Sequence, residues 1–452
     1  MDNQRPKMRL TIQTLNGYGI EPGAWRWPGN PADAFMDVNA FVNAAKEAER
    51  GKIDAYFLAD IPAVTTDLAT DPPQLTLEPM ITLTAMARET ERIGLVATAS
   101  TTFNDPYTVA RQFRALDVVS GGRVGWNAIT TSSPAAALNY GAEVPSRRER
   151  YERAHEFIAV VMALWGSWPD DALVLDTENG RFAHADKVRP VSVRGQHLFS
   201  MGPLGVPPSP QGQPVVFTAG GGVNGLHVAG RFADAVYNNP HDIPTAAGYA
   251  AAVGQMAQAY GRNPEHMTVF SGVITSIASS EREAIERRER LDELGDLDSK
   301  VVYVGYQLGI SLSPEDIDKP IHAELLARAF ASPGDPRSSL TLRLAQEGKT
   351  IREIIAYGPA HWAIHPVALG TPEHVADMLE TWFDAGVGGG FNITPDVASD
   401  GVTDFVDQVI PLLQKRGLFR TEYEGTTLRN HLGLPYQNGL PASYTIQEDA
   451  AG

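Results

Sequence analysis

A glycine-rich segment, TAGGGVNG, spans Thr218 to Gly225 between an apolar run and residues with helical spacing. Gly220, Gly222 and Gly225 fit G-x-G-x-x-G, a pattern in which backbone N–H groups approach a phosphate at a helix N-terminus. A nicotinamide site is disfavoured because no acidic residue ends the next strand, AVYNN. A tight turn without a ligand is the alternative. The segment favours a flavin phosphate site, with Gly221 and Gly222 as contacts.

Two further side chains have the chemistry of cofactor ligands. Arg147 and Tyr151 are four residues apart and share a helix face if the helix has begun by Arg147. A guanidinium and a phenol on one face suit a phosphate, and a solvated charged first turn is the alternative. Asp60 ends the apolar run YFLA, where an unsatisfied carboxylate is costly. We expect Asp60 to contact a cofactor or, alternatively, to cap the following loop.

Histidines and aromatic residues supply other candidates. His361 and His365 in HWAIH have the i, i+4 spacing of a zinc pair. Flanking prolines and the lack of an evident third ligand favour loop or lid histidines, so no metal is expected. A flat apolar pocket for a flavin ring and an aromatic substrate would use aromatic residues at strand ends, with core packing as the alternative for at least two of them. These residues are Tyr18, Trp25, Trp27, Phe57 and Trp126, of which we assign Tyr18, Trp25 and Phe57 to the substrate pocket.

The candidates follow apolar runs that alternate with helical segments. The runs are continuous rather than alternating, which is typical of parallel strands covered on both faces. Pro106 starts one helix and Gly121 closes it, the expected asymmetry. Eight strands are predicted, at 8–15, 55–59, 93–99, 124–129, 215–219, 235–238, 267–275 and 390–394. The main helices are predicted at 31–50, 79–90, 106–120, 151–165, 223–232, 245–260, 371–386 and 402–416, the last kinked by Pro411.

This α/β pattern predicts a (β/α)₈ TIM-like barrel, with an open doubly wound sheet as the alternative. One domain over residues 1–452 is expected, with long insertions after strands four and seven, at 169–214 and 295–370. The second insertion is a predicted lid, because it combines helical segments with Pro333 and Pro336. We expect proteases to reach it between residues 332 and 338.

Composition excludes several classes of protein. The formal net charge is −17, which argues against nucleic acid or an anionic membrane as partner. The absence of cysteine excludes disulfides, thiolate metal sites and a cysteine nucleophile. No apolar run approaches the ~18 residues of a membrane span, and the N-terminus lacks a signal-peptide core. We therefore expect a cytoplasmic protein.

Several motifs resemble those of the bacterial-luciferase-like flavin monooxygenases. Within that family, they are similar to the subgroup of nitrilotriacetate monooxygenase, dibenzothiophene-sulfone monooxygenase and pristinamycin synthase. The resemblance runs nearly end to end and is carried by GAWRWP, YFLAD, IGLVATAST, DPYTVARQF, SGGRVGWN, RYERAHEF, LWGSW, GTPEHVADMLETWFDAG and QKRGLFRTEYEGTTLRNHLGLP.

The resemblance implies a barrel that binds reduced FMN and activates dioxygen. It places Asp60, Thr98 and Asn127 near the flavin and Tyr151 at its phosphate. Two positions depart from the family pattern, which usually has histidine where this chain has Arg147 and serine where it has Gly221. Arginine still binds phosphate, and glycine keeps its N–H but loses the hydroxyl.

The predicted function is a two-component FMN-dependent monooxygenase acting on a small organic molecule. The implied partners are a separate NAD(P)H:flavin reductase, which supplies diffusible FMN, and further copies of the chain in a homo-oligomer. His241 in NNPHD is the first candidate for acid–base chemistry on position alone, followed by His322. A metal-dependent hydrolase on the same barrel and a non-catalytic flavin-binding protein are the alternatives.

Overall fold

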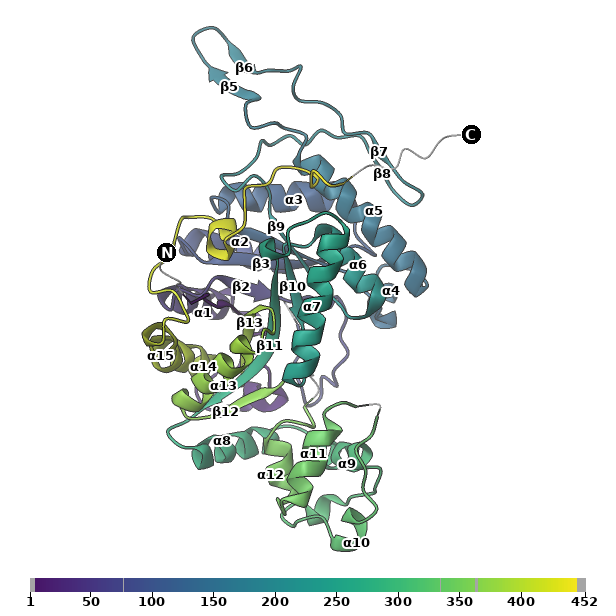
Figure 1. Cartoon of the computed structure of the whole chain (residues 1–452), viewed down its shortest axis with the longest axis vertical. Coiled ribbons are helices and arrows are strands. Elements are labelled where there is room, and N and C mark those ends of the chain that lie inside the picture. Colours follow the sequence, from purple (N-terminus) through teal and green to yellow (C-terminus); the bar gives the residue numbers. More distant parts are fainter. Residues whose placement is uncertain (1–4, 76, 334, 362–364, 445–452) are drawn as a thin grey trace.

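The chain folds around a closed barrel of eight parallel strands (Figure 1). This computed structural model describes residues 5–75, 77–333, 335–361 and 365–444. Neighbouring strands follow one another in sequence, and pairing of Ala235 with Thr268 and of Gly390 with Arg9 helps to close the ring. The predicted barrel is confirmed, and the open sheet is wrong. The barrel strands are β1 (Arg9–Ile12), β2 (Ala55–Leu58), β3 (Gly94–Ser100), β4 (Val124–Ile129), β9 (Val215–Ala219), β10 (Ala235–Asn238), β11 (Thr268–Ile277) and β13 (Gly389–Pro395).

Helices cover the outside of the barrel, and most begin at the predicted caps. The Asp105 side chain accepts a hydrogen bond from the Thr108 N–H at 2.9 Å. The first helix starts later than predicted, at Val38, because the preceding residues form turns and Asp37 provides the cap. The helices are α1 (Val38–Arg50), α2 (Pro79–Glu89), α3 (Pro106–Val119), α4 (Pro134–Asn139), α5 (Arg147–Trp165), α6 (Gly222–Phe232), α7 (Ile243–Ala259), α8 (Glu281–Glu293) and α13 (Pro372–Asp384).

The last barrel helix is irregular, as Pro411 suggested. A π-helical turn at Phe405–Val409 separates α14 (Ala398–Asp404) from α15 (Ile410–Lys415). Proline lacks the N–H that an α-helix requires, so the ladder is interrupted in the turn before it.

Two apolar layers lie on either side of the strands. Outside the barrel, Trp126 packs against Phe113, Phe157 and Trp165 with ring centroids 5.9–6.0 Å apart. Trp126 is therefore a core residue, as the packing alternative predicted. Inside the barrel, Phe217 lies 6.2 Å from Phe57 and 5.9 Å from Phe270, forming an aromatic layer across the middle.

The amino-terminal end of the barrel is plugged by α16 (Leu428–Leu432). Leu428 and Leu432 are buried in one cluster with residues of β2, β3, β9 and β10. Arg429, only 1% exposed, bonds the Asp234 carboxylate at 2.9 Å and the Gln213 carbonyl oxygen at 3.3 Å. A buried guanidinium is tolerated only when paired in this way, so the plug docks in one orientation.

Two long segments stand outside this framework (Figure 1). Between α5 and β9 the chain forms two antiparallel hairpins, β5 (Leu173–Asp176) with β6 (Arg181–Ala183) and β7 (Val193–Arg194) with β8 (Phe199–Ser200), seen at the top of the view. After α8, a helical unit has its own apolar core, and β12 (Val367–Gly370) then extends the sheet beside β11. Its helices are α9 (Leu297–Leu308), α10 (Ala323–Leu326), α11 (Ser338–Gln346) and α12 (Ile351–Ala356). Among the described residues, no helix is long and apolar enough to cross a membrane.

Replacing Leu428, which is fully buried, with alanine should lower the free energy of unfolding by about 2–5 kcal/mol, because it opens a cavity in the plug. Denaturant titration followed by tryptophan fluorescence measures this loss. Leu68→Ala is the matched control, since Leu68 is 63% exposed and should change stability by less than about 0.5 kcal/mol. Equal losses in the two variants would contradict the plug.

Candidate active site

Polar side chains adjoin the aromatic layer inside the barrel. Asn127 pairs in register with the interior Phe217, so its side chain also enters the barrel, where it donates to Thr98 Oγ1 at 2.9 Å. Asn127 Oδ1 and both polar side-chain atoms of Asn392 are buried without a hydrogen-bond partner among the described residues. Buried polar groups are nearly always satisfied in native proteins. Asn127 and Asn392 thus form a polar floor inside the barrel mouth, the open end where the strands have their carboxyl ends. This polar floor fits a polar ligand.

Arg147 and Tyr151 lie together on the first turns of α5. A capping box between Ser146 and Glu149 starts this helix at Arg147, one turn before the predicted start. The capping-box pattern S-x-x-E is visible in the sequence as SRRE. The guanidinium carbon lies 5.9 Å from the centre of the Tyr151 ring. Arg147 is exposed, so its charge is available to a ligand.

The glycine-rich loop faces this pair. Gly220 and Gly222 have φ of 136° and 79°, which other residues rarely adopt. A Cβ atom on Gly222 would lie 2.7 Å from Arg147 Nη2, and one on Gly220 would lie 3.4 Å from Tyr151 Oη. Because α6 begins at Gly222, its first N–H groups and its positive dipole end also point here. The loop and the α5 side chains form one corner that suits a phosphate, and contact of Gly221 and Gly222 with a phosphate stays a prediction.

Tyr249 of α7, which sequence reasoning missed, holds the loop in place. Its hydroxyl donates to the Gly220 carbonyl oxygen at 2.8 Å. Burial and the nearby Tyr151 raise the pKa of Tyr249 to about 12, so the hydroxyl remains a donor. No local motif marks Tyr249, because its contact comes from the packing of α7 beside α6.

Asp60 follows β2, as predicted. It lines a cavity of about 430 Å³ with Thr98, Glu78 and Tyr140. Burial, and to a lesser extent Glu78, raises the pKa of Asp60 to about 6. Asp60 can therefore change its charge near neutral pH, which is unusual for a carboxyl group.

The predicted aromatic pocket divides into two places. Tyr18 and Trp25 line a cavity of about 330 Å³ that also includes Lys300. The Tyr18 hydroxyl donates to the Ala32 carbonyl oxygen at 2.6 Å. Phe57 does not line this cavity, because it belongs to the aromatic layer of the barrel interior. Trp27 lies beneath the guanidinium groups of Arg287 and Arg290. The guanidinium carbons of these residues are 4.8 and 5.0 Å from the centre of the Trp27 ring.

The predicted histidines are also separated. His241 follows β10, lies 3.1 Å from an Asp242 carboxylate oxygen and shares a cavity of about 570 Å³ with His365. His322 is exposed and caps the short helix α10, at the far end of the helical unit in Figure 1. His322 therefore drops out of the candidate site, because its position reflects a capping contact.

His361 joins a buried ionic group instead of a metal site. Its Nε2 lies 3.1 Å from Glu21 Oε2, and Glu21 also pairs with Arg288 of α8. Burial opposes ionisation of Glu21, but Arg288 and His361 hold its pKa well below the usual range. Residues 362–364 lie outside the described residues, so the helical spacing of HWAIH is not defined. No cluster of three potential metal ligands occurs in the described part of the chain.

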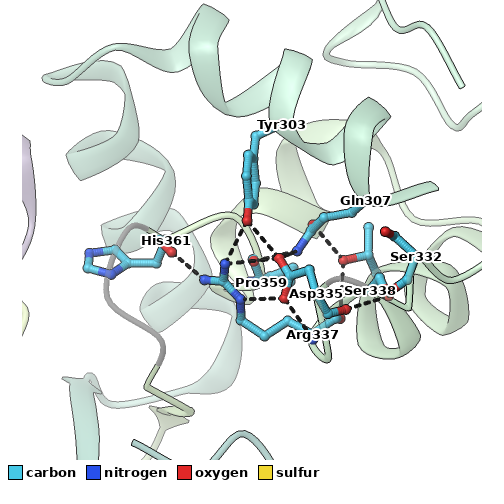
Figure 2. A network of polar contacts seen from close by, with 9 residues as sticks. Tyr303, Gln307, Ser332, Asp335, Arg337, Ser338, Pro359 and His361 are labelled. Carbon is cyan, nitrogen blue, oxygen red and sulfur yellow. Dashed lines mark hydrogen bonds and ion pairs between the residues drawn. The ribbon is translucent and has the colours of Figure 1, made fainter. Parts of the chain in front are cut away.

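A second network fixes the segment around Asp335 (Figure 2). The Asp335 carboxylate accepts hydrogen bonds from Tyr303 at 2.7 Å and from Gln307 at 2.8 Å, and it also binds Arg337. Figure 2 shows Arg337 reaching the backbone oxygen of His361 as well. Asp335 and Ser338 are 5% and 1% exposed. Pro333 and Pro336 are exposed, however, so protease access to this segment stays a prediction.

Comparison with known proteins identifies relatives with similar sequences and a similar fold. The family described as luciferase-like monooxygenase matches residues 12–388. N-acetyl-S-(2-succino)cysteine monooxygenase of Bacillus subtilis (strain 168) is 38% identical, covering 96% of this chain and 98% of that protein. Nitrilotriacetate monooxygenase component A of Aminobacter aminovorans is 38% identical, covering 92% and 94%. The solved EDTA monooxygenase of Chelativorans sp. BNC1 superposes with a TM-score of 0.78 at 33% identity, covering 95% and 99%.

These matches extend over nearly the whole chain and share its barrel. The resemblance expected from the motifs is confirmed. The chain therefore belongs to the luciferase-like monooxygenase family and is a flavin-dependent monooxygenase.

Proposed function

We propose that this chain is the oxygenase of a two-component system and uses reduced FMN delivered by a separate reductase. The corner formed by Arg147, Tyr151 and the glycine loop carries the choice of FMN, because it offers a cation, a phenol and helix N–H groups to one phosphate. The lack of a nicotinamide-binding turn favours a separate reductase. The name of the nitrilotriacetate relative, component A, also denotes one part of a larger system.

The residues present fit a flavin at two levels. The corner would hold the phosphate, and the unpaired Asn127 Oδ1 and the unpaired amide of Asn392 would meet the polar edge of the ring. Reduced flavin, when bound, supplies the electrons with which one atom of dioxygen enters the substrate and the other leaves as water. The chain's task is to orient the substrate and to exclude water.

The cavity beside Tyr18 and Trp25 is the proposed substrate entrance. It lies next to the loop after β1, and Lys300 connects it to the helical unit. Its aromatic walls suit an apolar or flat part of a small organic molecule. We propose that the helical unit is the lid over this entrance, anchored to the loop after β1 by the Glu21 contacts with Arg288 and His361. His241 remains a candidate for proton transfer.

Arg147→Ala should weaken binding of FMN tenfold or more and leave riboflavin binding unchanged, because riboflavin lacks the phosphate. Loss of one charge-assisted hydrogen bond costs about 1.5–3 kcal/mol. Anaerobic fluorescence titration of each ligand gives the affinities. Arg148→Ala is the matched control, since the Arg148 side chain is 86% exposed and pairs with Glu152. Equal losses for both ligands would place Arg147 away from the phosphate.

Reduced FMN should bind more tightly than oxidised FMN, because a flavin carried by diffusion must be captured after reduction and released after turnover. Titration of both redox states under anaerobic conditions tests this expectation. Equal affinities, or rapid NADH oxidation by this chain alone, would count decisively against this expectation.

Arg337→Ala should increase cleavage by trypsin or chymotrypsin in the helical unit and raise hydrogen peroxide release relative to product. The reason is that Arg337 ties Asp335 to the His361 backbone, and a loosened lid admits water. Arg343→Ala, on an exposed face of α11, is the control. If Arg337→Ala protein is cleaved faster yet keeps full coupling of oxygen use to product, the unit is not a lid.

A further inference from the structure

Tyr237 and His365 meet inside the barrel mouth, and Tyr237 was not among the predicted site residues. Tyr237 lies on β10 in register with the interior Phe270, and its ring stacks on Phe57 at 5.6 Å with an interplanar angle of 24°. Its hydroxyl forms a short hydrogen bond with His365 Nε2. Phe57 is buried, whereas Tyr237 is partly exposed. Tyr237 is therefore the partly exposed member of this stacked pair.

Gly272 of β11 makes room for this pair. A Cβ atom there would lie 2.8 Å from Tyr237 Oη and would overlap the His365 ring. Gly272 is not among the residues with positive φ, so space is what the position requires. Gly272 pairs in register with Asn392, whose side-chain amide lacks a partner among the described residues. The phenol group thus lies at the level of the polar floor.

The surroundings of His365 Nδ1 bear on which residue donates the hydrogen bond between Tyr237 and His365. His365 Nδ1 is buried without a partner among the described residues. A buried unpaired N–H is rarer and costlier than a buried unpaired acceptor. Burial, together with His361, lowers the pKa of His365 to about 3, so the ring is neutral and carries one proton. The Nε2–H tautomer avoids this cost, and in that tautomer His365 donates to the Tyr237 oxygen.

This arrangement leaves the Tyr237 proton free for another acceptor. Burial raises the pKa of Tyr237, and a side-chain contact with Gln13 only partly offsets this, so the hydroxyl stays protonated. We propose that Tyr237 donates a hydrogen bond to an acceptor atom of the flavin ring bound over the polar floor. His365 is a positioning residue that fixes the direction of this hydroxyl. The inference rests on the proposed function, because it presumes that a flavin occupies the mouth.

The tautomer can be measured without flavin. Nitrogen NMR of enzyme labelled with ¹⁵N-histidine should show His365 as the neutral Nε2–H form at neutral pH, with the signal assigned by its loss in His365→Gln. Gly272→Ala should shift that signal, because the added methyl group displaces the ring. A His365 ring protonated on Nδ1 would overturn the proposal, since Tyr237 would then donate to His365.

Measurements of flavin binding test the proposed hydrogen bond from Tyr237 to the flavin ring. Tyr237→Phe should weaken reduced FMN and reduced riboflavin by the same factor, about three- to tenfold, the effect of one neutral hydrogen bond. Arg147→Ala, by contrast, should affect FMN alone. Tyr306→Phe is the matched control, because Tyr306 is 61% exposed on α9. Unchanged affinities for both ligands would overturn the proposal, and so would a rise in substrate KM without loss of flavin affinity, which would place the acceptor on the substrate.

These outcomes are distinct from failure of the proposed function. If the wild-type protein binds neither reduced FMN nor riboflavin, the proposed function fails along with the ring contact, even if the His365 tautomer is as expected. If the wild-type protein binds both and only Tyr237→Phe behaves as its control does, the ring contact alone is wrong.

Discussion

Closure of the parallel barrel is the constraint on which the other features depend. Because all eight strands run the same way, their carboxyl ends meet at one mouth and their amino ends at the other. The amino end is filled by the apolar residues of α16, and the middle is filled by the aromatic layer. Polar groups adjoin the aromatic layer on its carboxyl side. Asn392 lies two residues beyond Gly390, which pairs with Phe270, and the Tyr237 hydroxyl lies beside Gly272, which pairs with Asn392.

Buried charges connect the barrel to the helical unit. Glu21 lies in the loop after β1, Arg288 on α8 and His361 in the segment before β12. Removing one partner would leave an uncompensated buried charge, which costs far more than the net stabilisation that the pair provides. The network therefore holds the helical unit in a fixed position against the loop after β1. Asp335 and Arg337 extend this dependence into the unit itself.

The sequence predicted what depends on local signals. Continuous apolar runs marked all eight barrel strands, and Pro106 with its Asp105 cap marked the start of α3. Contacts between residues far apart in the chain could not be predicted from local signals. Tyr237 and His365 are 128 residues apart, and nothing near either residue indicates the other. Phe57 and His322 were predicted from position along the chain, but the direction of a side chain and the distance of an insertion from the mouth depend on tertiary packing.

A crystal structure of the protein soaked with FMN tests the central claim most directly, which is that one corner of the mouth holds the phosphate and the polar floor meets the ring. The account predicts the phosphate within hydrogen-bond distance of Arg147, Tyr151 and the first N–H groups of α6, with the ring over Asn127 and Asn392. A phosphate bound elsewhere, such as the cavity beside His241, would contradict it.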